Sequence, residues 1–210
     1  TNPYHPSALL SPWVNRVRNG NYSFEGRNYQ LPINEENLGN AIHGLLARKP
    51  FSYQLEGSKA IVRFVYQAEE KAYPFPFETT LTYEFDENNV FHMQFEAINT
   101  GVGNMPFACG WHPYFQLPDG ELADWTIRFD SISKFHSDSQ MIPLREEPFD
   151  ASRGVSLGEE TLDNVFRLHP MENHQTVFDS GKSKITMEQS SIDFPFLVVF
   201  APENENCLAI

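Results

Sequence analysis

A histidine set among bulky apolar residues is the first candidate for chemistry in this chain. His112 lies in the run Cys-Gly-Trp-His-Pro-Tyr-Phe, which covers residues 109–115. Pro113 biases the residue before it toward an extended backbone, and the apolar neighbours are expected to leave the imidazole partly desolvated. Histidine has the unperturbed pKa best suited to moving a proton near neutral pH. We therefore take His112 as the candidate proton-transfer residue.

Two further segments carry polar side chains that could hold a ligand. His43 precedes Gly44 in the run Asn-Ala-Ile-His-Gly, where the glycine permits close approach of the backbone to a ligand. The alternative is a turn with a hydrogen-bonded histidine. Arg16 stands in the run Trp-Val-Asn-Arg-Val. Its guanidinium fork could donate to ligand oxygens, or it could be a surface arginine with a buried stem.

The remaining histidines are better explained by solvation. His92 falls on the polar face of a predicted strand. The others fall in polar segments that we predict to be surface loops, and these are His5, His136, His169 and His174.

Three known motifs fail on their spacing. The Gly-Lys-Ser run at 181–183 ends like a phosphate-binding loop, but Thr176 stands where that motif requires its first glycine. Cys109 and His112 could form half of a metal site, but no second pair follows at ligand spacing. The chain also lacks the Gly-x-Ser-x-Gly nucleophile elbow. Because the Cys109 and His112 pair has no partner pair, we predict no metal site.

The elements that must position these residues are predicted to be strands. Apolar and polar side chains alternate along Val90–Asn99, with Phe91, Met93 and Phe95 on the inward face. Thr79–Asp86 alternates in the same way. This period of two is typical of half-buried antiparallel strands.

Further strands, with little helical periodicity between them, point to a single all-β domain. A hairpin is predicted with strands at Asn21–Phe24 and Asn28–Leu31, and other strands at Ala60–Gln67, Trp125–Phe129, Lys184–Glu188 and Phe196–Ala201. Strands without intervening helices favour a sandwich or barrel. We predict one domain over residues 1–210, with Leu9–Asn19 and Asn34–Lys49 as long functional loops.

Length and charge exclude several classes of protein. The chain has 210 residues and a net charge of −13, and a surface that negative disfavours nucleic acid and anionic lipid. No apolar run is long enough to cross a membrane, and no signal peptide is visible. Two cysteines do not make a disulfide framework. These features predict a cytoplasmic protein that binds neither nucleic acid nor membrane.

Taken in order, the segments resemble the aldose 1-epimerase, or galactose mutarotase-like, family along nearly the whole chain. The most specific match is His112-Pro113-Tyr114-Phe115, which is similar to the His-Pro-Tyr-Phe motif of that family. The other matches are, in chain order, Asn15-Arg16-Val17 with Gly20 and the hairpin that follows, Asn40-x-x-His43-Gly44, and Leu162-Asp163-Asn164-Val165-Phe166. Four motifs in the same order are far more specific than any one of them.

The resemblance implies a large antiparallel β-sandwich, a galactose mutarotase-like supersandwich, with a sugar cleft on one sheet. It also implies interconversion of the α and β anomers of a free hexose, without a cofactor. In that reaction a base takes the proton of the C1 hydroxyl, and an acid protonates the ring oxygen as the C1–O5 bond breaks. The C1 unit then rotates, and the ring closes on its other face.

The family pattern also assigns roles to residues. His112 is implied to be the acid at the ring oxygen, and His43 a second catalytic donor near it. The implied substrate-binding residues are Arg16, Asn40, Asp163 and Trp111. Asp163 would accept hydrogen bonds from sugar hydroxyls, unless it is a loop aspartate that caps a turn. Trp111, or an aromatic residue near it, would pack on an apolar sugar face, with core packing as the alternative.

One departure from the family concerns the general base. The base of the family is a glutamate near the C-terminal end, and we expect it immediately after Ile210. Family members also usually carry further strands before the Asn-Arg segment. We therefore expect the 210 residues to be part of a longer sandwich, incomplete at both ends. A natural truncation is the alternative, although the apolar run at 208–210 would then leave a strand meant for burial open.

Two other functions stay open on the sequence. One is a hexose-6-phosphate epimerase of the same superfamily, whose phosphate could use the nearby cations Arg18, Arg27, Arg48 and Lys49. The other is a noncatalytic carbohydrate-binding domain that keeps the binding residues and lacks the base. The expected partner in each case is a small-molecule sugar, and the sequence indicates no oligomeric state.

Overall fold

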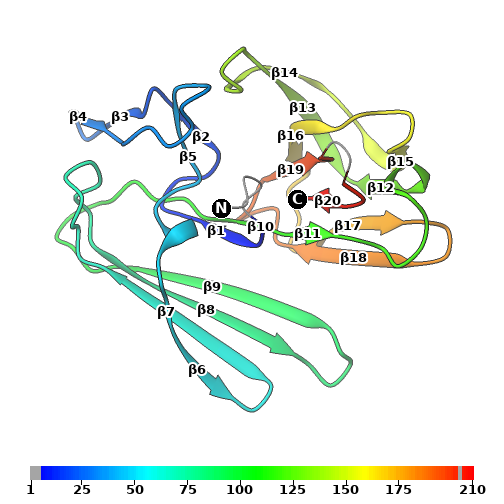
Figure 1. Cartoon of the computed structure of the whole chain (residues 1–210), viewed down its shortest axis with the longest axis horizontal. Coiled ribbons are helices and arrows are strands. Elements are labelled where there is room, and N and C mark those ends of the chain that lie inside the picture. Colours follow the sequence, from blue (N-terminus) through cyan, green and yellow to red (C-terminus); the bar gives the residue numbers. More distant parts are fainter. Residues whose placement is uncertain (1–5, 203–204) are drawn as a thin grey trace. The chain divides into compact units, whose positions relative to one another are not determined.

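The computed structural model describes residues 6–202 and 205–210 and consists mainly of antiparallel strands (Figure 1). The chain divides into two compact units. The meander unit is Ser11–Cys109, and the sandwich unit is Gly110–Ile210 together with the segment that ends at Leu10. The prediction of one domain over 1–210 stays a prediction. In the described part of the chain, no helix has the length and apolar composition needed to span a membrane.

The meander unit is built on four consecutive antiparallel strands. They pair in the order β6-β7-β8-β9, with bounds β6 (Ser52–Glu56), β7 (Lys59–Tyr66), β8 (Phe77–Phe85) and β9 (Phe91–Asn99). Two small two-stranded sheets precede them: β2 (Arg16–Arg18) with β5 (Asn40–Ile42), and β3 (Asn21–Phe24) with β4 (Arg27–Gln30). A single-turn 3-10 helix, η1 (Leu46–Arg48), follows β5.

Alternation along β8 explains why the meander forms. Phe77, Thr79 and Leu81 are buried on one face of this strand, and the register with β9 places Phe95 opposite Leu81. Toward the far end of the same face Phe85 is 57% exposed. The strands predicted at 79–86 and 90–99 are therefore confirmed, but the predicted inward face is buried only over part of its length.

The turn of the first hairpin contains two residues. Glu25 and Gly26 both have positive φ, 46° and 75°, which is the requirement of a type I′ turn. Phe24 pairs with Arg27 directly across it. The sequence predicts a three-residue turn, and Arg27 instead belongs to β4, because the type I′ turn matches the twist of the two flanking strands.

The sandwich unit contains two larger antiparallel sheets. The first has the order β11 (Tyr114–Phe115), β20 (Leu208–Ala209), β19 (Phe196–Phe200), β16 (Asp163–Leu168), β13 (Ser131–Ser137) and β14 (Pro143–Pro148). The second has the order β15 (Ala151–Ser156), β12 (Thr126–Phe129), β17 (His174–Asp179) and β18 (Lys184–Gln189). A short pair, β1 (Ala8–Leu10) with β10 (Gly110–His112), and the helix η2 (Leu122–Asp124) complete the unit.

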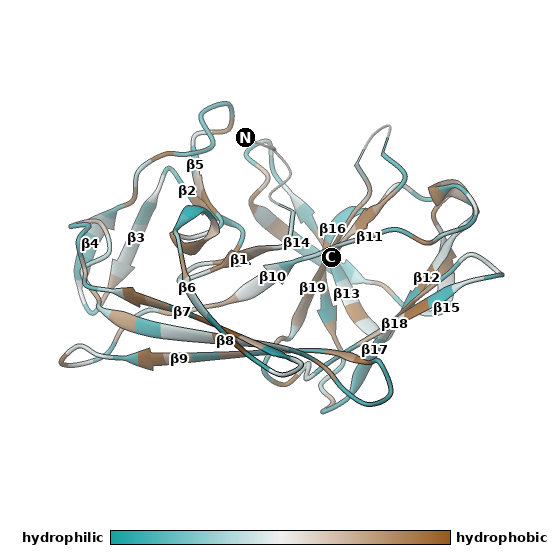
Figure 2. Ribbon diagram, turned by 60° about the horizontal axis from the view of Figure 1, so that its bottom comes forward, coloured by the Kyte–Doolittle hydropathy of each residue, from teal (hydrophilic) through white to brown (hydrophobic). Residues whose placement is uncertain are grey.

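The core of the sandwich unit lies between these two sheets. Large apolar side chains from both are almost fully buried there: Trp125, Ile127, Phe129, Phe166, Leu168, Phe178, Leu197, Val199 and Leu208. Burial of one such side chain contributes about 1.5–3 kcal/mol. Figure 2 shows hydrophobic and hydrophilic residues interleaved along the strands, as a sheet with one buried face requires.

Two of the histidines outside the motifs were placed wrongly by the sequence prediction. His174 is fully buried on β17, and its Nε2 lies 2.9 Å from the carbonyl oxygen of Asp130. The prediction of a surface loop is wrong here, because this strand is central to the second sheet. The loop prediction is also wrong for His136, because it lies on β13, where it is half-buried and pairs with Glu147. His92 and His169 are exposed as expected. His5 lies outside the described residues.

Buried tyrosines in the meander unit predict a loss of stability in alkaline solution. Burial raises the pKa of Tyr66 to about 12 and also raises the pKa of Tyr73. The Tyr66 hydroxyl donates to the carbonyl of Tyr73 at 2.9 Å. Because the unfolded phenol ionises near pH 10, this contribution is complete below pH 10 and is lost as the pH rises toward 12. Denaturant unfolding at a series of alkaline pH values should show that decline, and Tyr66→Phe should flatten it.

Candidate active site

The short pairing of β2 with β5 brings three predicted site residues together in the meander unit. Arg16 stands opposite Ile42 in the register, and Arg18 stands opposite Asn40. The backbone N–H of His43 donates to the carbonyl of Asn15 at 3.0 Å. Arg16, Asn40 and His43 therefore occupy neighbouring backbone positions in two paired segments. We predicted both segments to be loops, and they contain these short strands.

A carboxylate that the sequence analysis did not single out joins two of these side chains. Nε of Arg16 lies 3.0 Å from both oxygens of Glu35, and Nη2 lies 2.8 Å from Oε1. Nδ2 of Asn40 donates to Oε2 of the same carboxylate at 2.9 Å. Exposure of the side chains is 20% for Arg16 and 13% for Glu35. The sequence held one signal, because an arginine in a largely apolar run needs a charged or hydrogen-bonding partner if its guanidinium becomes buried. The local sequence did not indicate which residue that partner would be.

The backbone after β5 explains the His-Gly pair. His43 and Gly44 both have positive φ, 63° and 72°. A Cβ atom on Gly44 would lie 2.2 Å from the carbonyl oxygen of Ser11, and that oxygen accepts the N–H of Leu45 at 2.8 Å. Only glycine fits this close approach of two backbone segments. The half-buried His43 side chain is thus carried on a closely fixed loop.

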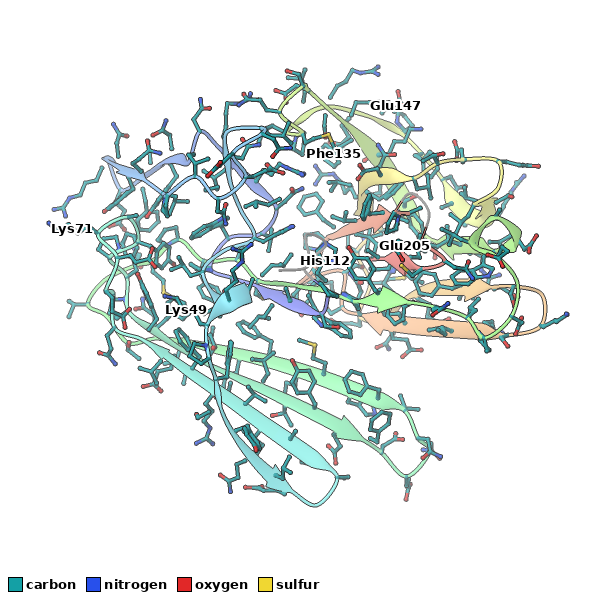
Figure 3. The ribbon with its side chains drawn as sticks, viewed as in Figure 1. Lys49, Lys71, His112, Phe135, Glu147 and Glu205 are labelled. Atoms are coloured by element: carbon teal, nitrogen blue, oxygen red, sulfur yellow. The ribbon has the colours of Figure 1, made fainter. Side chains whose placement is uncertain are left out.

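In the sandwich unit, His112 is the last residue of β10 (Figure 3). It pairs with Ala8 of β1, and its carbonyl accepts the N–H of Ser7 at 2.8 Å. The imidazole stacks on the ring of Tyr114, with the ring centroids 5.3 Å apart and the planes within 7°. The side chain is half-buried. The extended backbone predicted from Pro113 is confirmed.

Trp111 precedes His112 on the same strand and pairs with Leu9. Because successive side chains of a strand point to opposite faces, Trp111 and His112 lie on opposite faces of β10. Tyr114 is the aromatic neighbour that lies beside the His112 ring. Contact of Trp111, or of an aromatic residue near it, with a sugar stays a prediction.

Asp163 opens β16 and is exposed. Across the first sheet it pairs with Phe200, Phe200 pairs with Ala209, and Ala209 pairs with Tyr114. Residues directly opposite in antiparallel strands share a face, so Asp163 and Tyr114 lie on the same face. Three strand spacings separate them, or about 14 Å.

That shared face is the one turned away from the core of the sandwich unit. Phe115 and Leu208 are the next residues along β11 and β20, so their side chains point to the opposite face from Tyr114 and Ala209. That opposite face is the core, because Leu208 is fully buried and Phe115 stacks on Phe178 with ring centroids 5.2 Å apart. The outward face therefore carries the His112–Tyr114 ring pair at one edge and Asp163 further across the sheet. Such a face offers an aromatic surface and a hydrogen-bond acceptor to a polar ligand.

The cations considered for a phosphate site lie in several elements of the meander unit. Arg18 is on β2, Arg27 follows the hairpin turn, and Arg48 ends η1. Lys49 pairs with Glu70 at 3.6 Å. No observation favours a phosphate site among them. Within residues 6–202 and 205–210, no group of three or more histidine, cysteine, aspartate or glutamate side chains is arranged to hold a metal ion.

Comparison with known proteins identifies the family. The model of the family described as aldose 1-epimerase matches residues 1–209. The chain is 32% identical over 130 residues to the uncharacterised protein YihR of Escherichia coli, covering 56% of this chain and 42% of that protein. It is 27% identical over 125 residues to the bifunctional protein GAL10 of Kluyveromyces lactis, covering 56% of this chain and 18% of that protein. The chain thus spans less than half the length of these relatives.

Solved structures show the fold. A GalM/aldose epimerase homologue from Caenorhabditis elegans matches with a TM-score of 0.83 at 17% identity, over 99% of this chain and 73% of that one. Galactose 1-epimerase from Lactobacillus acidophilus matches with a TM-score of 0.72 at 18% identity, over 98% and 66%. The all-β, galactose mutarotase-like sandwich expected from the motifs is confirmed. With its family match spanning residues 1–209, the chain belongs to the aldose 1-epimerase family.

Proposed function

We propose that the protein interconverts the α and β anomers of a free hexose by acid–base ring opening. The observation that carries the proposal is the setting of His112. Its backbone is held in β10, its ring is stacked on Tyr114, and Asp163 lies on the same outward face of the adjoining sheet. Family membership supports an epimerase, and the choice of a free hexose follows the motif pattern.

The proposed reaction requires only proton transfers and one bond rotation. A base removes the proton of the C1 hydroxyl while His112 protonates the ring oxygen, and the C1–O5 bond breaks to give the open-chain aldehyde. Rotation about C1–C2 turns the other face of the carbonyl toward the O5 hydroxyl. Ring closure then returns both protons, so no cofactor is consumed. An imidazole suits this role because it gains and loses a proton near neutral pH.

The remaining predicted residues are proposed to bind the sugar. Arg16 commits three of its five N–H bonds to Glu35 and Asn15 among the described residues, which leaves one N–H on each terminal nitrogen for hydroxyl oxygens. His43 is proposed as a second donor at the ring oxygen, and Asn40 as a further polar contact. Asp163 is proposed to accept hydrogen bonds from sugar hydroxyls, as an ionised carboxylate does.

The base is proposed to be a glutamate placed directly after Ile210. The N–H of Ile210 donates to the carbonyl of Pro113 at 3.1 Å, and Ala209 pairs with Tyr114. In an antiparallel ladder each step forward on one strand is a step back on its partner. A residue one position after Ile210 in this register would stand opposite His112. The acid and the base would then lie on neighbouring strands.

Polarimetry on freshly dissolved α-glucose and α-galactose tests this proposal. Three chains are compared: one that ends at Ile210, one extended by a glutamate and a short polar tail, and one with glutamine in place of that glutamate. We expect the glutamate extension to accelerate anomer exchange over the other two by roughly 10²–10⁴-fold, the usual contribution of acid–base catalysis.

The outcomes separate the possibilities. Equal acceleration by all three chains would show that the base lies elsewhere. No acceleration by any chain, with galactose binding retained in calorimetry, would replace the proposed activity with a noncatalytic sugar-binding role.

A further inference from the structure

We infer that Glu35 is a positioning residue that sets the orientation of Arg16 and Asn40 toward the sugar. The inference rests on the proposed function. It is carried by one feature: a carboxylate, 13% exposed in its side chain, whose two oxygens receive donors from two of the predicted binding residues. Glu35 itself belongs to none of the motifs that identified the site.

The geometry of the pair fixes the guanidinium as well as neutralising it. Nε and Nη2 of Arg16 engage the carboxylate side by side, the fork arrangement that only a planar guanidinium can make. Nη1 donates to Oδ1 of Asn15 at 3.2 Å. The plane of the guanidinium is therefore set by two separate partners, and its remaining N–H bonds point in fixed directions.

The loop that carries Glu35 is itself closed by backbone hydrogen bonds. The carbonyl of Glu35 accepts the N–H groups of Gly39 at 2.8 Å and Asn40 at 3.2 Å, and the N–H of Glu35 donates to the carbonyl of Asn40 at 3.1 Å. The Asn34 side chain exchanges hydrogen bonds with the backbone of Ile42 at 2.9 and 2.7 Å. A carboxylate held this firmly can orient its partners without reorganising when a ligand binds.

The same contacts argue against Glu35 as the general base. Both of its oxygens already accept hydrogen bonds from cationic or amide donors. Taking a proton from a sugar hydroxyl would replace the ion pair with a neutral acid beside a half-buried guanidinium, and that is unfavourable. Its role is therefore exerted through Arg16 and Asn40.

The experiment compares Glu35→Gln with Glu36→Gln in the protein that contains this chain. Glu36 is the next residue and is exposed, so its variant makes the same change of charge away from Arg16. We expect Glu35→Gln to lower kcat/KM by about 10- to 100-fold, the range for loss of a hydrogen bond between charged groups, chiefly through a higher KM. Glu36→Gln should match the wild type, and circular dichroism should show both variants folded.

A double-mutant cycle with Arg16→Gln shows whether Glu35 acts through Arg16. In the Arg16→Gln background, Glu35→Gln should reduce kcat/KM by much less than it does alone, because the partner it positions is gone. Additive losses, or a Glu35→Gln variant as active as Glu36→Gln, would overturn the inference. A wild-type protein that accelerates no anomer exchange would instead refute the proposed function, so the two failures are distinguishable.

Discussion

Replacing His112 with asparagine is expected to slow anomer exchange by roughly 10²–10⁴-fold while hexose binding persists. Asparagine is close to histidine in size and keeps one polar donor, so β10 and its pairing with Ala8 should survive. It cannot gain and lose a proton near neutral pH, and that capacity is what the ring-opening step requires. The rate of anomer exchange is measured by polarimetry, and galactose binding by calorimetry.

The matched control for this variant is His92→Asn. His92 also lies on a strand, but its side chain is 57% exposed and pairs with Asp86 at 3.2 Å in the meander unit. It has no place in the proposed reaction, and its variant should keep the full rate. An unchanged rate in His112→Asn would remove His112 from the mechanism. A variant that no longer binds galactose would show that the residue serves binding instead of proton transfer.

The strands could be predicted because their signal is local. Alternation with a period of two survives in a window of a few residues, so β9 begins at Phe91 where the strand was expected from Val90. Likewise β19 covers Phe196–Phe200 where Phe196–Ala201 was expected. The short strands β2 and β5 were missed, because three residues carry too little alternation to separate a strand from a loop. The longer strands β13 to β17 were not predicted either, although each has six or seven residues.

The features that sequence reasoning missed depend on contacts between distant residues. Glu35 meets Arg16 across 19 positions, and His174 meets the carbonyl of Asp130 across 44. When only the neighbouring residues in the sequence are considered, a charged or polar side chain is predicted to be exposed to solvent. The distant partner whose hydrogen bond compensates for its burial is not visible in such a short segment. No local feature of the sequence indicates the division into two units either, because no glycine- or serine-rich linker marks positions 10–11 or 109–110.

The candidate residues were singled out by motifs, which local patterns of charge and hydropathy could not do. The His-Pro-Tyr-Phe run led to His112, and the structure adds that Tyr114 of the same run is the ring on which the imidazole stacks. Spacing along the chain could not show that Asp163 shares a face with Tyr114. That relation depends on the pairing of β16, β19, β20 and β11, and it is read only from the register.

The second large effect is expected from Gly44→Ala, which should lower the free energy of unfolding by about 2–5 kcal/mol. A left-handed backbone, φ 72° at this position, costs a residue with a Cβ about 1–2 kcal/mol. The new methyl would also lie 2.2 Å from the carbonyl oxygen of Ser11. That atom belongs to the backbone, so no side chain can rotate away, and overpacking of this kind costs about 1–3 kcal/mol more.

Gly57→Ala separates the two causes, because Gly57 has a similar φ of 60° in the same unit and a Cβ atom there would meet no other atom within 4 Å. Its variant should lose only the conformational part, about 1–2 kcal/mol. Urea unfolding followed by circular dichroism measures both. Equal losses would mean that the segments around Ser11 and Gly44 can move apart at little cost. A clearly larger loss in Gly44→Ala would show that Gly44 is needed for the close packing of these two segments. The glycine of the His-Gly pair would then also maintain the backbone that carries His43.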